Sequence, residues 1–420
     1  MDRIDKFGEV SEYKKEMKRI VTILKALRQK KSGVYTNWED AAEWHMKYSN
    51  LHGQSSLALT ITLSPTGCEW AKQGGCTMCG EFEGSYKRKD LLRDPRFHIS
   101  QFVAAVTNPK VWETAHNEGV PISWIRINQE GNYTNMNEMH IDAQEMILRL
   151  AMSIKGVKRI TIESRPQYLN EFIVKRLYEI FKYSDVELEI GMGVEAENDV
   201  VRNVCINKQG TDKQFVETAK LLKMYNIHPL AYILLKPPFL TEQEAIEEAI
   251  ATAHFAAEIG YERISFEPMS IHQYTLVDLL KEIGLYKAPW LWSVVEVAKN
   301  CSDISNIFGI GGVGYYPIPS EYAHNYCSCS NCNSMFIDAI KAYNVSRDTS
   351  VFDSLYCDCL KQWKKECSEE SKPFKERLLL QLDLAEKALS TYNPKILSQD
   401  TPIRNLRIIS GGSQNKLENE

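Results

Sequence analysis

The sequence predicts an α/β protein whose main body is a partial (βα)6 barrel of the TIM type. One observation is the repeated alternation of short apolar, β-branched segments with longer amphipathic segments between residues 57 and 267. The other is a glycine-rich loop after the first of these segments, which holds Cys68, Cys76 and Cys79. Because α/β proteins place their chemistry at the carboxyl ends of parallel strands, this loop predicts where the functional site lies.

Six segments are predicted to be buried strands because they are short, apolar and rich in β-branched residues. They are residues 57–63, 122–128, 157–163, 186–192, 229–236 and 263–267. The helices expected between them cover about 99–107, 137–154, 169–183, 212–225 and 241–259. A glycine-rich apolar run at 307–314 could add a seventh strand.

The two ends of the chain differ in pattern from this barrel. Residues 10–31 predict an amphipathic helix with a basic, solvated face, and residues 33–54 predict an irregular, aromatic-rich segment that packs on the main body. Residues 373–391 predict a last helix. The expected division is an N-terminal helical extension (1–54), the barrel (55–300), a C-terminal cysteine-rich region with a helix (301–395) and a flexible polar tail (396–420).

Composition is that of an ordinary globular protein, with 44% hydrophobic and 25% charged residues among 420. No apolar run approaches the roughly 20 residues of a membrane span, and no signal-peptide core is present near the start, so we expect a cytoplasmic protein with no membrane partner. Eleven cysteines in a reducing compartment favour metal binding over disulfides. A net charge of −5 gives no overall attraction to nucleic acid.

The cysteine loop has the spacing C-x7-C-x2-C and no obvious fourth ligand. Three thiolates can hold a 4Fe–4S cluster and leave one iron open to a substrate or cofactor, which is the interpretation that we favour. Zinc completed by a distant ligand and a reduced, metal-free loop are the alternatives. Glycines on both sides of the cysteines let the backbone wrap closely around a bulky group.

The predicted strands end in polar or glycine residues that should converge on the same side of the barrel as the cysteine loop. Taken singly, each could be no more than a capping or turn residue. Together they predict a polar pocket, and they are Gly131, Glu163, Arg165, Gly193, Glu195, Lys236 and Glu267.

A second group of cysteines follows the barrel. Two C-x-C pairs about thirty residues apart, Cys327 with Cys329 and Cys357 with Cys359, predict a closed tetrahedral zinc site. Cys332 and His324 are either spare ligands of this site or play no part in it. A second iron–sulfur cluster and the absence of any metal are the alternatives.

Several phrases in order along residues 55–365 resemble the radical SAM superfamily, and within it the family of the archaeosine-forming radical SAM enzyme. The cysteine spacing departs from the usual C-x3-C-x2-C and is similar to long-spaced relatives of the radical SAM domain of the Elongator catalytic subunit. The phrases are Thr66-Gly-Cys-Glu-Trp with Gly75-Cys-Thr-Met-Cys-Gly, Ile162-Glu-Ser-Arg-Pro, Gly193-Val-Glu-Ala-Glu-Asn, Cys205-Ile-Asn-Lys208, Tyr232-Ile-Leu-Leu-Lys-Pro-Pro-Phe239 and Ala288-Pro-Trp-Leu-Trp-Ser293.

The resemblance implies a 4Fe–4S cluster on Cys68, Cys76 and Cys79, S-adenosylmethionine on its open iron, and hydrogen abstraction through a 5′-deoxyadenosyl radical. It also implies an electron donor of the flavodoxin or ferredoxin type. Site roles are implied as follows: Met78 near the adenine; Gly131 near the methionine amine; Glu163, Arg165, Gly193 and Glu195 around the ribose and carboxylate; Lys208, Lys236 and Glu267 toward the substrate.

The substrate is left open by one departure from the family pattern. After the second strand that family carries a Thr-Ser-Gly-Ser-Phe-Leu-Asp phrase, whereas this chain has Asn128-Gln-Glu-Gly-Asn-Tyr-Thr-Asn135. One hypothesis is cleavage of a C–N bond in a lysine-modified deazaguanine of tRNA. A second is a paralogue that acts on a small molecule or peptide, and a third is a zinc-stabilised binding module without catalysis.

Overall fold

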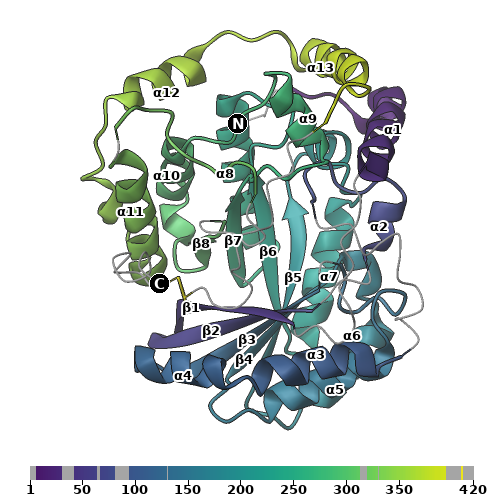
Figure 1. Ribbon diagram of the computed structural model, residues 1–420, viewed down its shortest axis with the longest axis vertical. Helices are drawn as coiled ribbons and strands as arrows, with labels where there is room; N and C mark the ends of the chain where they lie inside the picture. The colour runs from purple at the N-terminus through teal and green to yellow at the C-terminus, as the bar shows by residue number, and fades with distance from the viewer. Residues whose placement is uncertain are drawn as a thin grey trace.

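The computed structural model describes residues 6–30, 42–63, 67–80, 94–129, 131–312, 319–329, 331–393 and 408–409. Nine strands form one sheet in the order β8-β7-β6-β5-β4-β3-β2-β1-β9, which curls into an open half-barrel with helices on its outside (Figure 1). The strands are β1 (Glu43–Leu51), β2 (Gln54–Thr62), β3 (Ile122–Asn128), β4 (Arg159–Glu163), β5 (Glu187–Glu195), β6 (His228–Leu235), β7 (Arg263–Pro268), β8 (Phe308–Ile310) and β9 (Ile408–Ile409).

The parallel part of the sheet runs from β2 to β8 and confirms the predicted partial barrel, with β8 as its seventh strand. Helices that were predicted from periodicity are α1 (Lys14–Lys30), α3 (Arg96–Val106), α5 (Ile141–Met152), α6 (Glu171–Phe181), α7 (Asp212–Met224), α8 (Glu242–Glu258) and α13 (Phe374–Ala388). Helices that were not predicted are α2 (Glu69–Lys72), α4 (Pro109–Glu118), α9 (Leu276–Glu282), α10 (Leu291–Asn300), α11 (Cys332–Ser346) and α12 (Cys359–Ser368).

Strand β1 corrects the expectation that residues 33–54 are irregular. It pairs antiparallel with β2 through a tight turn in which His52 and Gly53 both have positive φ, 52° and 78°. Such two-residue turns match the twist of a hairpin. The strand alternates buried Trp44 and Met46 with His45 and Lys47, a period of two that the aromatic content of the segment masked.

The two faces of the sheet have opposite polarity. The face toward the helices is apolar, and Ile125 and Ile127 of β3 are fully buried there. The interior face carries the alternate, largely polar positions. Arg263 of β7 lies 4.6 Å from the ring of Trp124 on β3, although three strands separate β7 from β3 in the sheet. The sheet is therefore curved strongly enough for side chains to meet across its interior.

Helices from both ends of the chain lie together beside the barrel mouth. Arg19 of α1 forms ion pairs with Asp383 and Glu386 of α13, at 2.5 and 2.8 Å, and the two helices lie side by side (Figure 1). Within the described residues, no helix has the length and apolar character needed to cross a membrane. The predicted packing of Trp38 and almost all of the predicted tail lie outside the described residues, and the predicted domain limits stay predictions.

Candidate active site and metal centre

The loop after β2 presents the three predicted thiols at the carboxyl end of the sheet. Cys68 stands immediately before α2, Cys76 and Cys79 follow it, and all three are half-buried. Burial, the Glu138 carboxylate and the neighbouring Cys76 raise the pKa of the Cys68 thiol, while Arg165 opposes that rise. Met78 lies between Cys76 and Cys79 and is also half-buried.

A platform of backbone groups fixes this loop. It is the π-helical turn η5 (Val201–Cys205) with the residues that follow it. The Thr77 amide donates to the carbonyl of Ile206 at 2.9 Å, and the Thr77 hydroxyl donates to that of Cys205 at 2.8 Å. Asn207 donates its side-chain amide to the Gly75 carbonyl at 2.7 Å. The segment from Cys205 to Lys208 therefore holds the cysteine loop in place through these hydrogen bonds.

Helix α1 adds a buried arginine that the sequence did not reveal as part of the site. Arg28 is 4% exposed and donates to the carbonyls of Ala71 at 2.9 Å and Cys76 at 3.2 Å. Gly75 has φ of 70°, and a Cβ on it would fall on the Arg28 guanidinium. The only signal in the sequence was an arginine on the apolar side of an amphipathic helix.

Glu138 is a second residue that sequence analysis missed. Its carboxylate is fully buried and accepts hydrogen bonds from the Glu69 amide at 2.9 Å and from the side chains of Asn132 and Asn135. Burial raises its pKa, against the opposing effect of these hydrogen bonds. A Cβ on Gly131 would fall on this carboxylate and close to the Gly67 carbonyl. The segment that departs from the family phrase thus connects β3 to the cysteine loop.

The predicted residues that follow β4 and β5 meet beside Cys76. Lys208 forms an ion pair with Glu195 at 2.7 Å. Burial opposes the charge of Lys208, but Glu195 and Cys76 outweigh it and raise the pKa of the lysine. A Cβ on Gly193 would fall on both members of this pair, so the strand needs glycine there. Arg165 donates to the Lys208 and Gln209 carbonyls.

Below this level, further charged side chains cross the interior of the sheet. Tyr232 donates to Glu163 at 2.7 Å and accepts from Arg126 at 3.3 Å. Burial raises the pKa of Glu163, although Tyr232 and Arg126 act in the opposite direction. Glu267 accepts from the Ser265 hydroxyl at 2.6 Å and contributes to the electrostatics of Glu163. The predicted residues Glu163 and Glu267 therefore share the interior.

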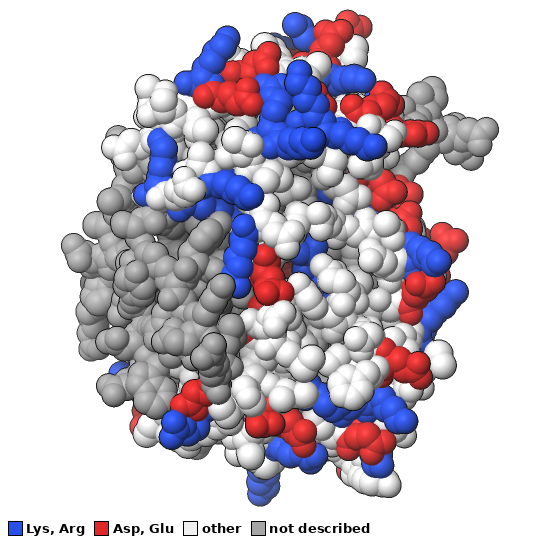
Figure 2. All heavy atoms as spheres, turned by 90° about the vertical axis from the view of Figure 1, so that its right-hand side faces the viewer, with Lys and Arg blue, Asp and Glu red and all other residues white. Residues whose placement is uncertain are grey.

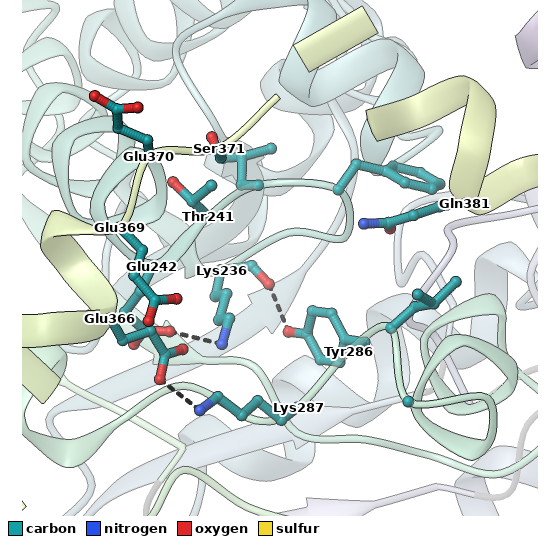
Figure 3. Close-up of a pocket in the computed structure, with 14 residues that line it drawn as sticks. Lys236, Thr241, Glu242, Tyr286, Lys287, Glu366, Glu369, Glu370, Ser371 and Gln381 are labelled. Carbon is teal, nitrogen blue, oxygen red and sulfur yellow. Dashed lines mark hydrogen bonds and ion pairs between the residues drawn. The ribbon is translucent and has the colours of Figure 1, made fainter. Parts of the chain in front are cut away.

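Lys236 lies apart from this group. Its ammonium pairs with Glu242 at 2.6 Å, and its carbonyl accepts from the Tyr286 hydroxyl at 2.6 Å. These residues line a cavity of about 340 Å³ together with Lys287 and Glu366, which pair at 2.5 Å (Figure 3). Among the residues that the structure describes, Lys236 has no hydrogen bond or ion pair with the cysteine loop, and it lies at the end of β6 in a separate cavity.

The C-terminal cysteines form a compact cluster whose membership differs from the predicted one. Cys327, Cys332, Cys357 and Cys359 place their sulfurs within 4.8 Å of one another. Cys332 takes the place predicted for Cys329, which is exposed. The reason is helix α11, whose first residue is Cys332 and whose start carries that thiol inward to 3.8 Å from the Cys359 sulfur.

His324, the other alternative ligand, is directed elsewhere. Its Nδ1 lies 2.8 Å from the Tyr322 carbonyl, and its ring packs on Tyr326. Donors from outside the cluster instead point at the sulfurs. Trp292 donates to Cys359 at 3.2 Å and Asn325 to Cys332 at 3.3 Å, the kind of support that orients metal-binding thiolates.

The two cysteine groups differ in spacing, which bears on what each can hold. A tetrahedral zinc ion with Zn–S of about 2.3 Å brings its sulfurs about 3.8 Å apart. In the C-terminal cluster the Cys332 and Cys359 sulfurs have this separation, and all four sulfurs lie within 4.8 Å of one another. Among the described residues that cluster is the one set of three or more metal-binding side chains within 4.8 Å, so the three loop thiols are spread more widely. Wider spacing beside the cations of Arg165 and Lys208 fits an anionic cluster whose separate irons each take one thiolate.

Comparison with known proteins finds relatives along most of the chain. A protein of Methanocaldococcus jannaschii that is itself uncharacterised is 30% identical over 323 residues, which span 75% of this chain and 83% of that protein. Archaeosine synthase subunit beta of Methanosarcina acetivorans is 29% identical over 334 residues, spanning 78% and 89%. The solved structure of Methanocaldococcus infernus Elp3 covers 71% of this chain and 64% of its own, with 12% identity and a TM-score of 0.45. No protein-family model matches.

The curled parallel sheet with the three-cysteine loop at its mouth confirms the predicted architecture, and relatives named as archaeosine synthase subunits cover most of the chain. An enzyme, rather than a binding module without catalysis, is therefore the class of this protein. The chain belongs to the family of the Methanocaldococcus jannaschii protein and is a relative of archaeosine synthase subunit beta.

Proposed function

We propose that Cys68, Cys76 and Cys79 hold a 4Fe–4S cluster and that S-adenosylmethionine binds at the iron without a cysteine. The observation that carries this proposal is the loop of three half-buried thiols, spread wider than a single ion requires and flanked by Lys208 and Arg165. When bound, this pair supplies one-electron cleavage of a sulfonium and a carbon radical that abstracts hydrogen. An electron donor of the flavodoxin or ferredoxin type would serve it.

The chain's own residues have three tasks in this proposal. Lys208 and Glu195 offer a charge pair next to Cys76 that can hold the carboxylate and hydroxyl groups of S-adenosylmethionine. Gly131 and Gly193 leave room where a side chain would collide with Glu138 or with that pair. Met78 offers an apolar surface between two ligands. These are the roles that the family resemblance implies.

The loop is also covered by neighbouring elements. Helix α1 braces it through Arg28, and the Thr77 carbonyl accepts from the Leu276 amide of α9 at 3.0 Å. A covered site restricts the water and thiols that would quench a radical. Glu163 and Glu267, deeper in the interior, are the groups that we assign to the substrate.

For the substrate, we favour an archaeosine-type reaction, cleavage of a C–N bond in a lysine-modified deazaguanine of tRNA. The support is the likeness to archaeosine synthase subunit beta over most of both chains. Helix α1 also carries exposed lysines that could contact RNA phosphates, namely Lys14, Lys15, Lys18 and Lys25.

A small-molecule or peptide substrate is the second candidate. Figure 2 shows Lys and Arg next to Asp and Glu over the face that carries α1, with a largely uncharged middle. This mixed surface, with the net charge of −5, lacks the single-sign field typical of nucleic-acid binding.

We propose zinc for the C-terminal cluster of Cys327, Cys332, Cys357 and Cys359. The 3.8 Å between the Cys332 and Cys359 sulfurs matches the edge of a zinc–thiolate tetrahedron. Cys332 and Cys359 are the first residues of α11 and α12, so the ion would join two helices to one loop. The use of cysteine for metals also supports our assignment of the protein to the cytoplasm.

The cluster proposal is tested by anaerobic reconstitution with iron and sulfide, followed by metal and sulfide analysis. The wild type should bind about four irons and one zinc, and Cys76→Ala should lose the iron but keep the zinc. Cys329→Ala is the matched control, because it removes an exposed cysteine that belongs to neither group. Full iron retention by Cys76→Ala would contradict the ligand assignment, and about eight irons without zinc would replace the zinc proposal with a second cluster.

The substrate proposal is tested by tRNA binding at increasing salt. We expect tight binding at low salt that weakens steeply as salt rises, because counterions are released from the phosphates. Absence of binding at low salt would exclude tRNA and favour the small-molecule candidate.

A further inference from the structure

Four polar side chains gather on the interior face near the open edge of the sheet. His45 and Lys47 come from β1, Thr60 from β2 and Arg126 from β3. In the sheet register His45 is opposite Thr60, and Thr60 is opposite Arg126. Opposed residues of neighbouring strands point to the same face, and residues two apart on one strand do also. All four therefore project into the interior below the cysteine loop.

These side chains lack the partners that buried polar groups normally have. Within the described residues, neither Lys47 nor His45 has a hydrogen bond or ion pair. Thr60 is 2% exposed and its hydroxyl has no partner, and the Arg126 Nε is buried without one. Arg126 keeps one partner, because its guanidinium donates to the Tyr232 hydroxyl at 3.3 Å. An unpaired buried polar group costs roughly 1–3 kcal/mol, so the Thr60 hydroxyl and the Arg126 Nε, next to the half-buried side chains of His45 and Lys47, require an explanation.

The side chains in register with Arg126 on the next two strands, Thr161 of β4 and Glu189 of β5, show the contrast. Glu189 accepts from Arg263 at 2.7 Å and from Thr161 at 2.8 Å, and it pairs with Arg159 at 3.5 Å. Both arginines also stack on Trp124. These side chains satisfy one another, whereas those on β1, β2 and β3 have donors without an acceptor.

The charged side chains around Lys47 indicate which kind of chemical group the unpaired donors of this site can bind. Arg126 is the cation that faces it and Glu267 the carboxylate. Glu163 is already engaged by Tyr232, and Glu267 by Ser265. Burial, with Lys47 and Arg126 nearby, lowers the pKa of His45 to about 3, so its imidazole is neutral at ordinary pH. Arg126 is also faced by Glu163 and Glu189. Each of these three carboxylates already accepts hydrogen bonds from other side chains, so the donors of Lys47 and His45 remain available to an added anionic group.

We propose that His45, Lys47, Thr60 and Arg126 form a site for an anionic oxygen group, a carboxylate or a phosphate, of the substrate. That the occupant is a substrate group rests on the proposed function. The site lies in the same interior as Glu163 and Glu267, below Cys76 and Lys208. Strand β1 supplies half of it, which gives the N-terminal hairpin a part in substrate selection.

The test is calorimetric titration of the reconstituted protein with inorganic phosphate and, separately, with acetate at constant ionic strength. We expect saturable binding of one anion, and the preferred anion tells whether the group is a phosphate or a carboxylate. Lys47→Met should weaken it at least tenfold, about 1.4 kcal/mol. Lys47→Arg should bind like the wild type. The matched control is Lys155→Met, which removes an exposed lysine on the outside of the barrel and should change nothing.

Thermal unfolding separates this role from a structural one. Lys47→Met removes an unpaired cation from a half-buried position, so the variant should melt at the same or a higher temperature than the wild type. A lower melting temperature, equal anion binding by Lys47→Met, or no saturable binding of either anion by the wild type would each overturn the proposal. Cleavage of S-adenosylmethionine by the wild type is measured separately, so loss of the proposed function and loss of the anion site are distinguishable.

Discussion

Replacement of Arg28 by methionine should loosen the cysteine loop without touching a ligand. The arginine is buried on α1 and donates to two loop carbonyls, those of Ala71 and Cys76, at 2.9 and 3.2 Å. Hydrogen bonds from charged groups contribute about 1.5–3 kcal/mol each, and methionine fills similar space but donates none. We take about 3 kcal/mol for the pair. If this loss falls on local opening of the loop, the opened population rises roughly 100-fold.

The assay is anaerobic release of iron from the reconstituted protein to a chelator. Arg28→Met should release iron much faster than the wild type. Arg19→Met is the control, because Arg19 lies on the same helix but pairs with Asp383 and Glu386 of α13 near the surface, where such pairs contribute at most about 1 kcal/mol. Equal release rates for the two variants would refute the role of Arg28 as a brace.

Three further predictions follow from the remaining contacts. Cys332→Ser should lose the C-terminal metal while Cys329→Ser keeps it, and metal analysis that shows the reverse would restore the pattern predicted from sequence. Lys208→Met removes the charge-assisted hydrogen bond between Lys208 and Glu195, which contributes about 1.5–3 kcal/mol. The affinity for S-adenosylmethionine should therefore fall about tenfold or more. Unchanged affinity in equilibrium dialysis would contradict this prediction. Burial lowers the pKa of His45 to about 3 in the folded protein, whereas the pKa is about 6.5 in the unfolded chain. The neutral His45 therefore contributes stability above pH 6.5, and this contribution is lost as the pH falls toward 3. Between pH 7.5 and 5.5, the free energy of unfolding in urea should fall by about 1.4 kcal/mol more for the wild type than for His45→Gln. If the two proteins lose the same free energy over this range, His45 is not buried as a neutral group.

The barrel could be predicted from sequence because its strands and helices carry local signals. The segment 122–128 matches β3 at both ends, because it is short, mostly apolar and rich in β-branched residues. Helices α9 to α12 follow the last long strand and lie outside the strand–helix repeat that marks the other helices. In the structure α9 packs on α1 and α13, α10 packs on α8 and α11, and α12 packs on α8, so contacts distant in sequence help to decide their bounds.

In the site, sequence analysis identified the candidate ligand cysteines but not the residues that hold their loop in place. The three loop cysteines are recognisable from spacing alone. Arg28 and Glu138 act through contacts 43 or more residues away, from α1 to the loop and from the β3 segment to Glu69, and no local pattern marks such pairs. Cys329 looked like a ligand because C-x-C spacing is a metal signal, but the start of α11 brings Cys332 inward instead.

The changed segment after β3 has a different meaning in the structure. Sequence comparison made Asn128–Asn135 the place where the substrate could differ. Asn132 and Asn135 are instead buried and donate to the Glu138 carboxylate, which also accepts from the Glu69 amide next to Cys68. The segment therefore supports the cysteine loop, and the open polar groups that can select a substrate lie on β1, β2 and β3.

The most direct test of the central claim is reductive cleavage of S-adenosylmethionine by the iron-loaded protein under anaerobic conditions. The wild type and Cys329→Ala should form 5′-deoxyadenosine, and Cys76→Ala should form none. Iron-loaded wild type that binds S-adenosylmethionine but yields no 5′-deoxyadenosine on reduction, or Cys76→Ala that yields as much as the wild type, would contradict the assignment of this loop as the catalytic centre.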